Sequence, residues 1–332
     1  MKKFCLILTA ALLLAACGQS YEETKRLTRQ QRHEAWQRDS AALKIAVMPT
    51  LDCLPLFVAR EERLLDTIYG GVRLKHYTAQ MDCDTALTRH RVEGMVSDLV
   101  RTRRVERQGL KLRYMAQTGA YWQLVANRNA RIHQLKQLDG KMVAMTRYSV
   151  TDMLTDRVAD SAALRRERVF KVQVNDVAVR MLMLRNNEMD ALWLAEPQAT
   201  EARLMKNPVL CDSRTMGLQP GVIAFNETEM RHPGRAKQLS LLQDAYDKAC
   251  DLINQRGLSH YRDLIVRCCQ VRPEAVDSLP PITFQHARGP RQEDLAAVDR
   301  WLGVKPAKGD SAKKGRKGAK AAKGRRGRRG RQ

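Results

Sequence analysis

The sequence contains no internal apolar run of the ~20 residues that a helix needs to cross a bilayer. Its 7 histidines are scattered along the chain, and none of them forms a catalytic pair at a fixed spacing. No two cysteines have the close spacing of a zinc motif, and the adjacent Cys268 and Cys269 have poor geometry for one tetrahedral ion. An integral membrane domain, histidine-based catalysis and a metal or other cofactor are therefore not expected.

The first residues have the organisation of an export signal. Two lysines precede an apolar run of about 11 residues at 4–14, and Ala15 and Ala16 form a small-residue cleavage site before Cys17. Together with Gly18, this segment resembles a bacterial lipobox, in which the cysteine is acylated and becomes the mature N-terminus. We therefore expect a signal peptide at 1–16, lipidation of Cys17 and a membrane-anchored protein that faces the periplasm or the cell exterior. An ordinary secretory signal that ends near a cysteine is the alternative.

Acidic residues are in the minority: 36 Asp and Glu oppose 59 Lys and Arg, which gives a formal net charge of +23. Segment 303–332 holds 13 basic residues and one acidic residue, and it supplies +12 of that charge. Because this tail has almost no large apolar side chains, it is predicted to be disordered. The basicity is therefore no evidence for a nucleic-acid-binding fold.

The basic tail has two interpretations. In an exported protein it would meet anionic lipid, lipopolysaccharide or another anionic surface, with an affinity that falls as the salt concentration rises. The alternative is a solvated extension without a specific partner, and the sequence does not decide between the two.

Six cysteines lie outside the signal and the lipobox, an even set that can form disulfides in an exported protein. Six cysteines allow 15 pairings. We favour Cys53 with Cys83, because each follows a predicted strand and both should lie at one edge of the sheet. We also favour Cys250 with Cys268 or Cys269, between neighbouring helices.

From residue 43 onward, short apolar strand patterns alternate with loops and helix patterns. This alternation predicts α/β structure with largely parallel sheets flanked by helices. The predicted strands are 43–48, 72–77, 94–96, 121–126, 142–145, 170–174, 190–194 and 221–226, and the longest predicted helix is 233–254.

The alternation occurs twice, and the chain is long enough for two compact lobes. We predict one lobe at 43–118 and 219–302, because the last strand and helices should return to the first sheet, and a second lobe at 119–218. The polar segment 17–42 is predicted to form a helical or flexible stalk before the first lobe.

Four segments are similar to those of a known protein family. Segment 43–66 resembles its opening strand and helix, and 94–98 resembles its Asp-Gly-x-x-x-x-Asp segment. Segment 135–144 resembles Leu-x-x-Leu-x-Gly-Lys-x-Val-Ala, and 187–197 resembles Gly-Glu-x-Asp-Ala-x-x-x-x-Glu-Pro. The family is the periplasmic binding proteins of type II topology, in the branch that serves nitrate, sulfonate, taurine and thiamine-precursor pyrimidine importers.

The chain departs from the family pattern at three places. Glu93 replaces the first acid of the second segment, and the basic tail has no counterpart. Asn187 stands where glycine is usual, which is tolerable because asparagine also accepts left-handed backbone angles.

The resemblance implies a monomeric two-lobe protein with a ligand cleft between the lobes. Proteins of this kind close over a small solute and deliver it to the permease of an ABC importer, and they are not enzymes. Binding shifts the open and closed populations because the solute touches both lobes only in the closed form.

Ligands of open α/β sheets bind beyond the carboxyl ends of the strands. This rule selects the following candidates: Thr50, Leu51, Asp52, Gln80, Met81, Asp82, Ser97, Asp98, Tyr148, Ser149, Asp176 and Glu196. Asp98 and Glu196 are the stronger candidates, since both follow short apolar strands. Helix capping is the alternative for Asp52 and Asp82, and Ser149 is either a plain cap or an anion site at a helix start. If most of these acids face the cleft, the solute should be cationic or rich in donors, such as an amine or an aminopyrimidine.

Two rival functions stay open. Related two-lobe folds carry out chemistry in the synthesis of pyrimidines and of menaquinone precursors, and an exposed Cys53 would be a candidate nucleophile. In an oxidising compartment, however, a disulfide is favoured for that cysteine. The second rival is a protein that binds surface polyanions through its basic tail.

Overall fold

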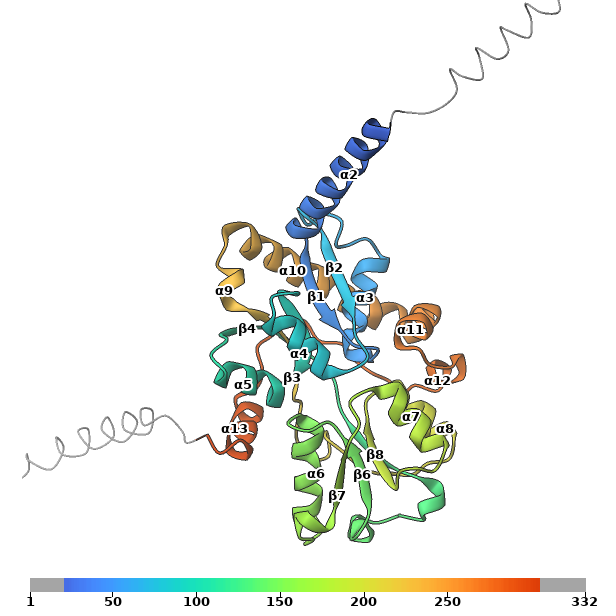
Figure 1. The fold of residues 1–332 in the computed structure, drawn as a ribbon. Coiled ribbons are helices and arrows are strands. Elements are labelled where there is room, and N and C mark those ends of the chain that lie inside the picture. Colours follow the sequence, from blue (N-terminus) through green and yellow to red (C-terminus); the bar gives the residue numbers. More distant parts are fainter. Residues whose placement is uncertain (1–20, 305–332) are drawn as a thin grey trace, which may run out of the picture.

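The computed structural model describes residues 21–304, which form two α/β lobes, each built on a five-stranded sheet (Figure 1). The expected two-lobe α/β fold is confirmed. The signal peptide, Cys17 and the tail beyond residue 304 lie outside the described residues. Within residues 21–304, no helix combines the length and the apolar composition that a bilayer crossing requires.

The first sheet has the strand order β2-β1-β3-β10-β4. Its strands are β1 (Leu43–Val47), β2 (Val72–His76), β3 (Gly94–Asp98), β4 (Leu112–Gln117) and β10 (Gly221–Asn226). β1 pairs in parallel with β2 and β3, whereas β10 is antiparallel to both of its neighbours. The chain therefore returns to this sheet from the second lobe through β10.

The second sheet has the order β7-β6-β8-β5-β9. Its strands are β5 (Gln123–Ala126), β6 (Met142–Met145), β7 (Phe170–Gln173), β8 (Ala191–Leu194) and β9 (Val209–Asp212). β6 is parallel to β7 and β8, and β5 is antiparallel to β8 and β9. Both sheets thus have the same topology. In each strand order the fourth strand, β10 or β5, runs antiparallel to both of its neighbours. The sequence analysis missed the edge strands β4 and β9, which are only partly buried and have weak apolar patterns.

Helices flank both sheets (Figure 1). Those of the first lobe are α3 (Leu54–Glu61), α4 (Gln80–Thr88), α5 (Leu99–Arg107), α9 (Glu227–Met230), α10 (Pro233–Arg256), α11 (Arg262–Cys269), α12 (Pro273–Asp277) and α13 (Gln292–Trp301). Those of the second lobe are α6 (Val150–Ser161), α7 (Val177–Arg185) and α8 (Gln198–Leu204). Short 3₁₀ turns at Leu51–Cys53, Arg128–Ala130, Leu135–Leu138, Arg166–Arg168 and Leu258–Tyr261 complete the elements.

The first strand–loop–helix unit shows how the sequence builds the edge of the cleft. β1 is almost wholly buried, and every residue of α3 from Leu54 to Ala59 is buried because α10 and α11 cover it. Pro55 fits the first turn of α3, where its missing N–H has no intrahelical partner to lose. The intervening loop at 48–53 therefore lies fixed at the carboxyl end of β1.

Helix α13 joins the two lobes at their common edge. Its Ala297 and Val298 belong to one apolar cluster with Leu99 of α5 and Trp193 of β8. Trp301 Nε1 also donates a hydrogen bond to Asp156 Oδ2 on α6 at 2.9 Å. The C-terminal helix thus packs against the first lobe and is bonded to the second.

Helix α2 (Tyr21–Ala41) occupies most of the predicted stalk and projects away from the first lobe (Figure 1). It is mainly polar, and its last turn is tied to the sheet by Asp39. The Asp39 carboxylate lies 2.8 Å from Lys44 Nζ and 3.2 Å from Arg73 Nε. The stalk is therefore helical where the structure describes it.

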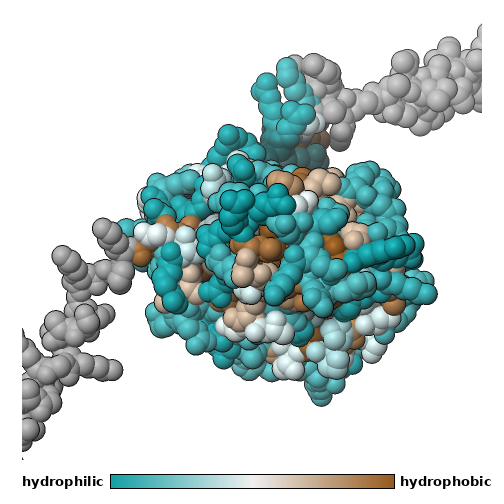
Figure 2. Space-filling model, turned by 90° about the horizontal axis from the view of Figure 1, so that it is seen from below, coloured by the Kyte–Doolittle hydropathy of each residue, from teal (hydrophilic) through white to brown (hydrophobic). Residues whose placement is uncertain are grey.

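The surface at the second-lobe end of the molecule is mainly hydrophilic, with apolar residues gathered in small groups (Figure 2). Met142 and Phe170, which pair across β6 and β7, are 39% and 50% exposed. Apolar surface of this limited extent is usual for a monomeric protein and requires no partner.

The expected disulfide between Cys53 and Cys83 is absent, since both are free and buried. The Met48 backbone N–H donates a hydrogen bond to Cys53 Sγ at 3.3 Å, so that sulfur closes the loop after β1 instead. Burial raises the pKa of both thiols well above the ordinary value, which keeps them protonated and unreactive.

The expected pairing of Cys250 with Cys268 or Cys269 is also wrong, because all three are free thiols in this structure. Cys250 Sγ donates a hydrogen bond to the Gln285 backbone oxygen at 3.4 Å. Cys268 Sγ accepts one from Arg60 Nη2 at 3.8 Å. Each sulfur therefore faces a different part of the first lobe, a placement that cysteine spacing in the sequence does not reveal.

The close packing of β3 on β10 yields a stability prediction. A Cβ added at Gly94 would lie 2.4 Å from Cε1 of the fully buried Phe225 ring. We expect Gly94→Ala to lower the free energy of unfolding by roughly 1–3 kcal/mol, as overpacked cores do, in urea denaturation. Gly234→Ala on α10 is the control, because a Cβ there meets no atom within 4 Å. Equal stability of the two variants would contradict this packing.

Candidate functional site

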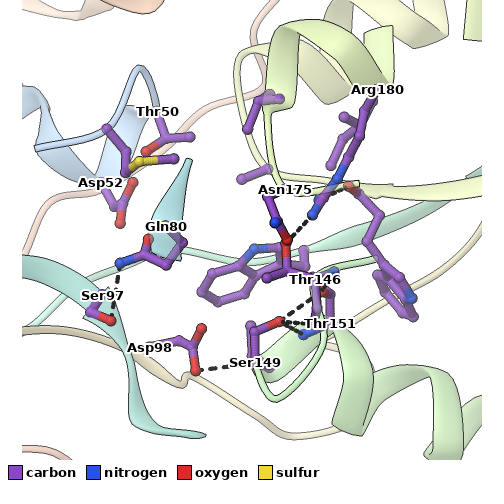
Figure 3. A pocket seen from close by; sticks show the side chains of 17 residues that line it. Thr50, Asp52, Gln80, Ser97, Asp98, Thr146, Ser149, Thr151, Asn175 and Arg180 are labelled. Atoms are coloured by element: carbon purple, nitrogen blue, oxygen red, sulfur yellow. Dashed lines mark hydrogen bonds between the residues drawn. The ribbon is translucent and has the colours of Figure 1, made fainter. Parts of the chain in front are cut away.

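A cavity lies between the lobes, at the carboxyl ends of strands from both sheets (Figure 3). The first lobe contributes Met48, Thr50, Asp52, Gln80, Ser97 and Asp98, and the second contributes Trp122, Thr146, Ser149, Val150, Thr151, Asn175, Val177, Arg180, Trp193, Leu194 and Ala195. Met48, Thr146 and Ala195 directly follow β1, β6 and β8, and Ser97, Asp98, Trp193 and Leu194 end β3 and β8, as the strand-end rule for α/β sheets expects. The cavity has a volume of about 70 Å³. One buried water needs roughly 10–15 Å³, so the space suits a molecule of few non-hydrogen atoms.

Asp98 connects the two lobes through a single carboxylate oxygen. Its Oδ1 accepts a hydrogen bond from the Arg101 backbone N–H at 3.0 Å, in the first turn of α5. The same oxygen accepts one from the Val150 backbone N–H at 3.1 Å, in the first turn of α6 across the cleft. Among the described residues, none donates to Oδ2, so that oxygen stays free for a ligand. Burial raises the pKa of Asp98 to about 6, although Arg101 and these hydrogen bonds oppose the shift.

The rest of the first-lobe wall is polar and ordered. Gln80 Nε2 donates to the Val96 backbone oxygen and to Ser97 Oγ, both at 3.1 Å. Burial raises the pKa of Asp52, against the opposing effect of a hydrogen bond with Thr50. This side of the cavity therefore presents two carboxyl groups and several neutral polar groups.

The second-lobe wall begins at the N-terminus of α6. Ser149 caps this helix, since its Oγ accepts a hydrogen bond from the Thr151 backbone N–H at 3.1 Å. The same hydroxyl donates to the Thr146 backbone oxygen at 2.7 Å. Ser149 is thus a helix cap and a cavity residue at once, which combines the two interpretations drawn from the sequence.

Arg180 brings a buried positive charge to the same wall. It is 5% exposed, and it donates from Nε to the Val174 oxygen at 2.7 Å and from Nη1 to the Trp193 oxygen at 2.9 Å. Its Nη2 bonds to Thr146 Oγ1. All three partners are neutral, and burial lowers the pKa of Arg180 to about 10. The negative charge of Asp176 opposes this shift but does not outweigh the effect of burial.

Six of the twelve predicted binding residues line the cavity: Thr50, Asp52, Gln80, Ser97, Asp98 and Ser149. Leu51 and Glu196 line a neighbouring cavity of about 20 Å³ instead. Asp82 and Met81 are exposed on α4, the latter at 40%.

Two further candidates have structural contacts outside the cavity. The ring of Tyr148 is covered by Arg104, whose Cζ lies 4.0 Å from the ring centroid. Asp176 caps α7 by accepting a hydrogen bond from the Val179 backbone N–H at 3.1 Å. Helix capping therefore accounts for this aspartate.

Glu196 is buried just beyond β8, outside the main cavity, and both of its carboxylate oxygens accept hydrogen bonds. Its Oε1 accepts hydrogen bonds from Tyr121 Oη at 3.0 Å, Gln123 Nε2 at 2.8 Å and Arg203 Nη2 at 2.9 Å. Its Oε2 accepts from the Thr200 N–H at 2.9 Å and from Thr200 Oγ1 at 2.7 Å. With both oxygens occupied, Glu196 organises the strand–helix connection of the second lobe.

Other residues of the family-like segment 187–197 also have structural tasks. Asn187 adopts a φ of 60°, as expected for a position where glycine is usual. Asp190 Oδ2 accepts a hydrogen bond from the Met142 backbone N–H at 2.9 Å and so supports β6. The acidic residues of the segment that resembles the family most therefore support the second lobe, while its Trp193, Leu194 and Ala195 line the cavity.

The sequence analysis missed several cavity residues for identifiable reasons. Thr146 is the first residue after the strand predicted at 142–145, so the strand-end rule applied directly at the end of that strand would have found it. Arg180 lies in a helical pattern at 176–185, where its sequence gives no sign of burial. Trp122 and Trp193 lie in or beside apolar strands, where an aromatic residue reads as core.

The lobes are in contact around the cavity, so this is a closed arrangement. Ala79 and Asp176 form an isolated antiparallel bridge across the cleft. Gln198 Nε2 donates to the Pro49 oxygen at 2.7 Å and to the Cys269 oxygen at 3.0 Å. Within residues 21–304, no cluster of three or more His, Cys, Asp or Glu is arranged to hold a metal ion.

The shared topology and the cavity between the lobes define the periplasmic-binding-protein fold of type II. The alkanesulfonate-binding protein SsuA from Xanthomonas axonopodis pv. citri, bound to MOPS, has this fold with a TM-score of 0.67 and 15% identity, over 80% of this chain and 92% of that chain. The periplasmic aliphatic sulphonate-binding protein SsuA from Escherichia coli gives a TM-score of 0.63 and 16% identity, over 79% and 87%.

The periplasmic nitrate-binding protein NrtA from Synechocystis gives a TM-score of 0.63 and 14% identity, over 81% of this chain and 83% of that chain. The structural neighbours therefore come from the nitrate and sulfonate branch that the sequence motifs resemble. At these identities the likeness establishes the fold. No protein-family model and no curated protein sequence matches the chain.

The raised pKa of Asp98 predicts a pH-dependent stability. The ordinary value of 3.8 applies to the unfolded chain and about 6 to the folded protein. Because the folded protein binds this proton more tightly, the contribution of Asp98 to the free energy of unfolding falls as the pH rises from about 4 to about 6. Asp98→Asn keeps an acceptor oxygen and removes the titration.

We therefore expect the free energy of unfolding of D98N, minus that of the wild type, to rise over this pH range by on the order of 3 kcal/mol. Urea denaturation at several pH values measures the difference. Asp244→Asn, which removes the same charge from an exposed position, serves as the control. If the free energy of unfolding of D98N differs from that of the wild type by the same amount at every pH, Asp98 does not cause the pH dependence of the stability.

The bonding of Glu196 predicts a structural phenotype. Glu196→Ala removes an acceptor from four side chains, and we expect a loss of roughly 2–4 kcal/mol in the free energy of unfolding. Thermal and urea denaturation measure this loss. The exposed Glu167→Ala variant of the same lobe should stay within about 0.5 kcal/mol of the wild type. A Glu196→Ala variant as stable as Glu167→Ala would exclude the structural role.

Proposed function

We propose that this protein is the extracytoplasmic solute-binding component of an ABC importer, which captures a small organic solute between its lobes and delivers it to a permease. The observation that carries the proposal is the cavity enclosed by polar and charged side chains of both lobes. A solute in that position stabilises the closed form because only the closed form contacts it from both sides. The fold shared with sulfonate- and nitrate-binding proteins supports the same function.

The chemistry of the first-lobe wall supports a solute with a cationic or donor-rich group, such as an amine or an aminopyrimidine. Asp52 and Asp98 supply carboxyl oxygens, and Gln80 and Ser97 supply neutral polar groups. The other acids predicted for the cleft, Asp82, Asp176 and Glu196, do not contribute to this wall. The preference for donors therefore depends on two carboxyl groups.

Export and anchoring are part of the proposal and depend on the N-terminal sequence. The signal at 1–16 and the lipidation of Cys17 would hold a monomer at a membrane surface, in the periplasm or at the cell exterior. Helix α2 would then separate the first lobe from the lipid. A contact between the basic tail and an anionic surface is compatible with solute capture.

The composition of the cavity favours binding over chemistry. Among the described residues that line it, none is a histidine or a cysteine. Burial raises the pKa of the Cys53 thiol, which disfavours the nucleophilic thiolate.

A thermal-shift screen tests the proposal. We expect at least one compound among amines, pyrimidines, sulfonates and amino acids to raise the melting temperature, because a ligand that binds only the folded form stabilises it. Asn175→Leu, which removes a polar group from the cavity wall, should weaken binding of that compound at least tenfold.

Asn186→Leu is the matched control, because Asn186 is exposed on the same lobe and outside the cavity. The affinity of the Asn186→Leu variant for the compound found in the screen should equal that of the wild type. If no compound raises the melting temperature, or if both variants lose affinity equally, the cavity is not a solute site.

A further inference from the structure

The cavity carries opposite charges on its two lobes. Asp52 and Asp98 belong to the first lobe, whereas Arg180 belongs to the second (Figure 3). We infer that the solute is a small zwitterion, with an amine against Asp52 and Asp98 and an oxyanion, such as a carboxylate or a sulfonate, against Arg180. This inference rests on the proposed solute-binding function and specifies its ligand class.

Arg180 has the properties of an oxyanion site. Its three hydrogen bonds go to two backbone oxygens and one hydroxyl, so part of its five-donor guanidinium stays available. Among residues 21–304, no ion pair joins Arg180 to a carboxylate. Asp176 is close enough for its charge to raise the pKa of Arg180, but its carboxylate caps α7. A buried cation without an ion-pair partner is costly, and an oxyanion in the cavity would reduce that cost with bidentate geometry.

The first-lobe carboxyl groups have the complementary properties. Neither Asp52 nor Asp98 forms an ion pair with a basic side chain of the described residues. Burial raises the pKa of both groups, which shows that their negative charge is poorly compensated in the protein itself. An ammonium group of a solute would supply the missing charge and donate to Asp98 Oδ2.

A solute with one charged end would satisfy only one wall. A simple anion bound at Arg180 would lie in a small cavity together with two carboxyl groups and be repelled by them. A simple amine would be attracted by the carboxyl groups and repelled by Arg180. In a buried site these interactions are weakly screened, so a molecule with both charges is favoured over either one alone.

The size of the cavity limits the separation of the two charges. A volume of about 70 Å³ accommodates a short chain between amine and oxyanion and excludes a long one. Suitable probes are 3-aminopropanoate, propanoate and propylamine, which differ in charge and have similar lengths. The pair 2-aminoethanesulfonate and ethanesulfonate tests the second kind of oxyanion.

Calorimetric titration of the purified protein with these five probes tests the inference. We expect the zwitterion of at least one series to bind at least tenfold more tightly than its single-charge counterparts. Asp52→Asn should reduce the affinity for the zwitterion at least tenfold and should not weaken binding of the anionic probe. The exposed Asp244→Asn variant is the matched control and should bind all probes like the wild type.

Melting curves of D52N identify any loss of folding, and Arg180→Lys provides an independent variant that keeps the charge. R180K should lose affinity for the zwitterion and for the anion, while propylamine binding stays unchanged. Loss of propylamine binding as well would overturn the assignment of the oxyanion to Arg180.

The remaining outcomes separate the inference from the proposed function. If an anion or an amine binds as tightly as the zwitterion, the ligand class is wrong and solute capture stands. If none of the five probes binds but a compound of the thermal-shift screen with at most one charge does, the ligand class is likewise wrong, whereas binding of an amino acid from that screen supports it. If no small solute of either set binds, both the ligand class and the solute-binding function are overturned.

Discussion

The arrangement of the cleft depends on one carboxylate shared between two helices of different lobes. Asp98 Oδ1 accepts the backbone N–H groups of Arg101 on α5 and Val150 on α6. The first turns of both helices carry unsatisfied donors and partial positive charge, so a single anion between them stabilises both. Any opening of the lobes must separate Asp98 from one of these helices, and any ligand near α6 must coexist with this contact.

The second constraint is the cost of burying charge at the cleft. Arg180 is held by neutral oxygens, while Asp52 and Asp98 form no ion pair within the described residues, so the protein separates opposite charges across a small space. The desolvation of these charges costs free energy, and a bound molecule with complementary charges would offset that cost. The ionic contacts that do form are elsewhere, for example between Glu201 and Arg272 at 3.0 Å, where they join the lobes away from the cavity.

The family-like segment at 187–197 illustrates how far sequence patterns carry an argument. It identified the fold correctly, and its residues turn out to support the backbone: Asn187 adopts a left-handed angle, and Glu196 is satisfied by five hydrogen bonds. A motif whose polar side chains support the backbone predicts architecture well. It predicts polar ligand contacts poorly, because those side chains already have partners within the protein.

The sequence by itself determined the α/β class, the two lobes and the strand ends that line the cleft, because alternating apolar segments and strand-end loops are local patterns. It also located Asp98 and Ser149 at those ends. Only the tertiary structure decided that Cys53 and Cys83 stay unpaired, that Glu196 turns away from the cavity and that Arg180 turns into it. These outcomes depend on which face of an element meets a distant one, and no local pattern specifies that.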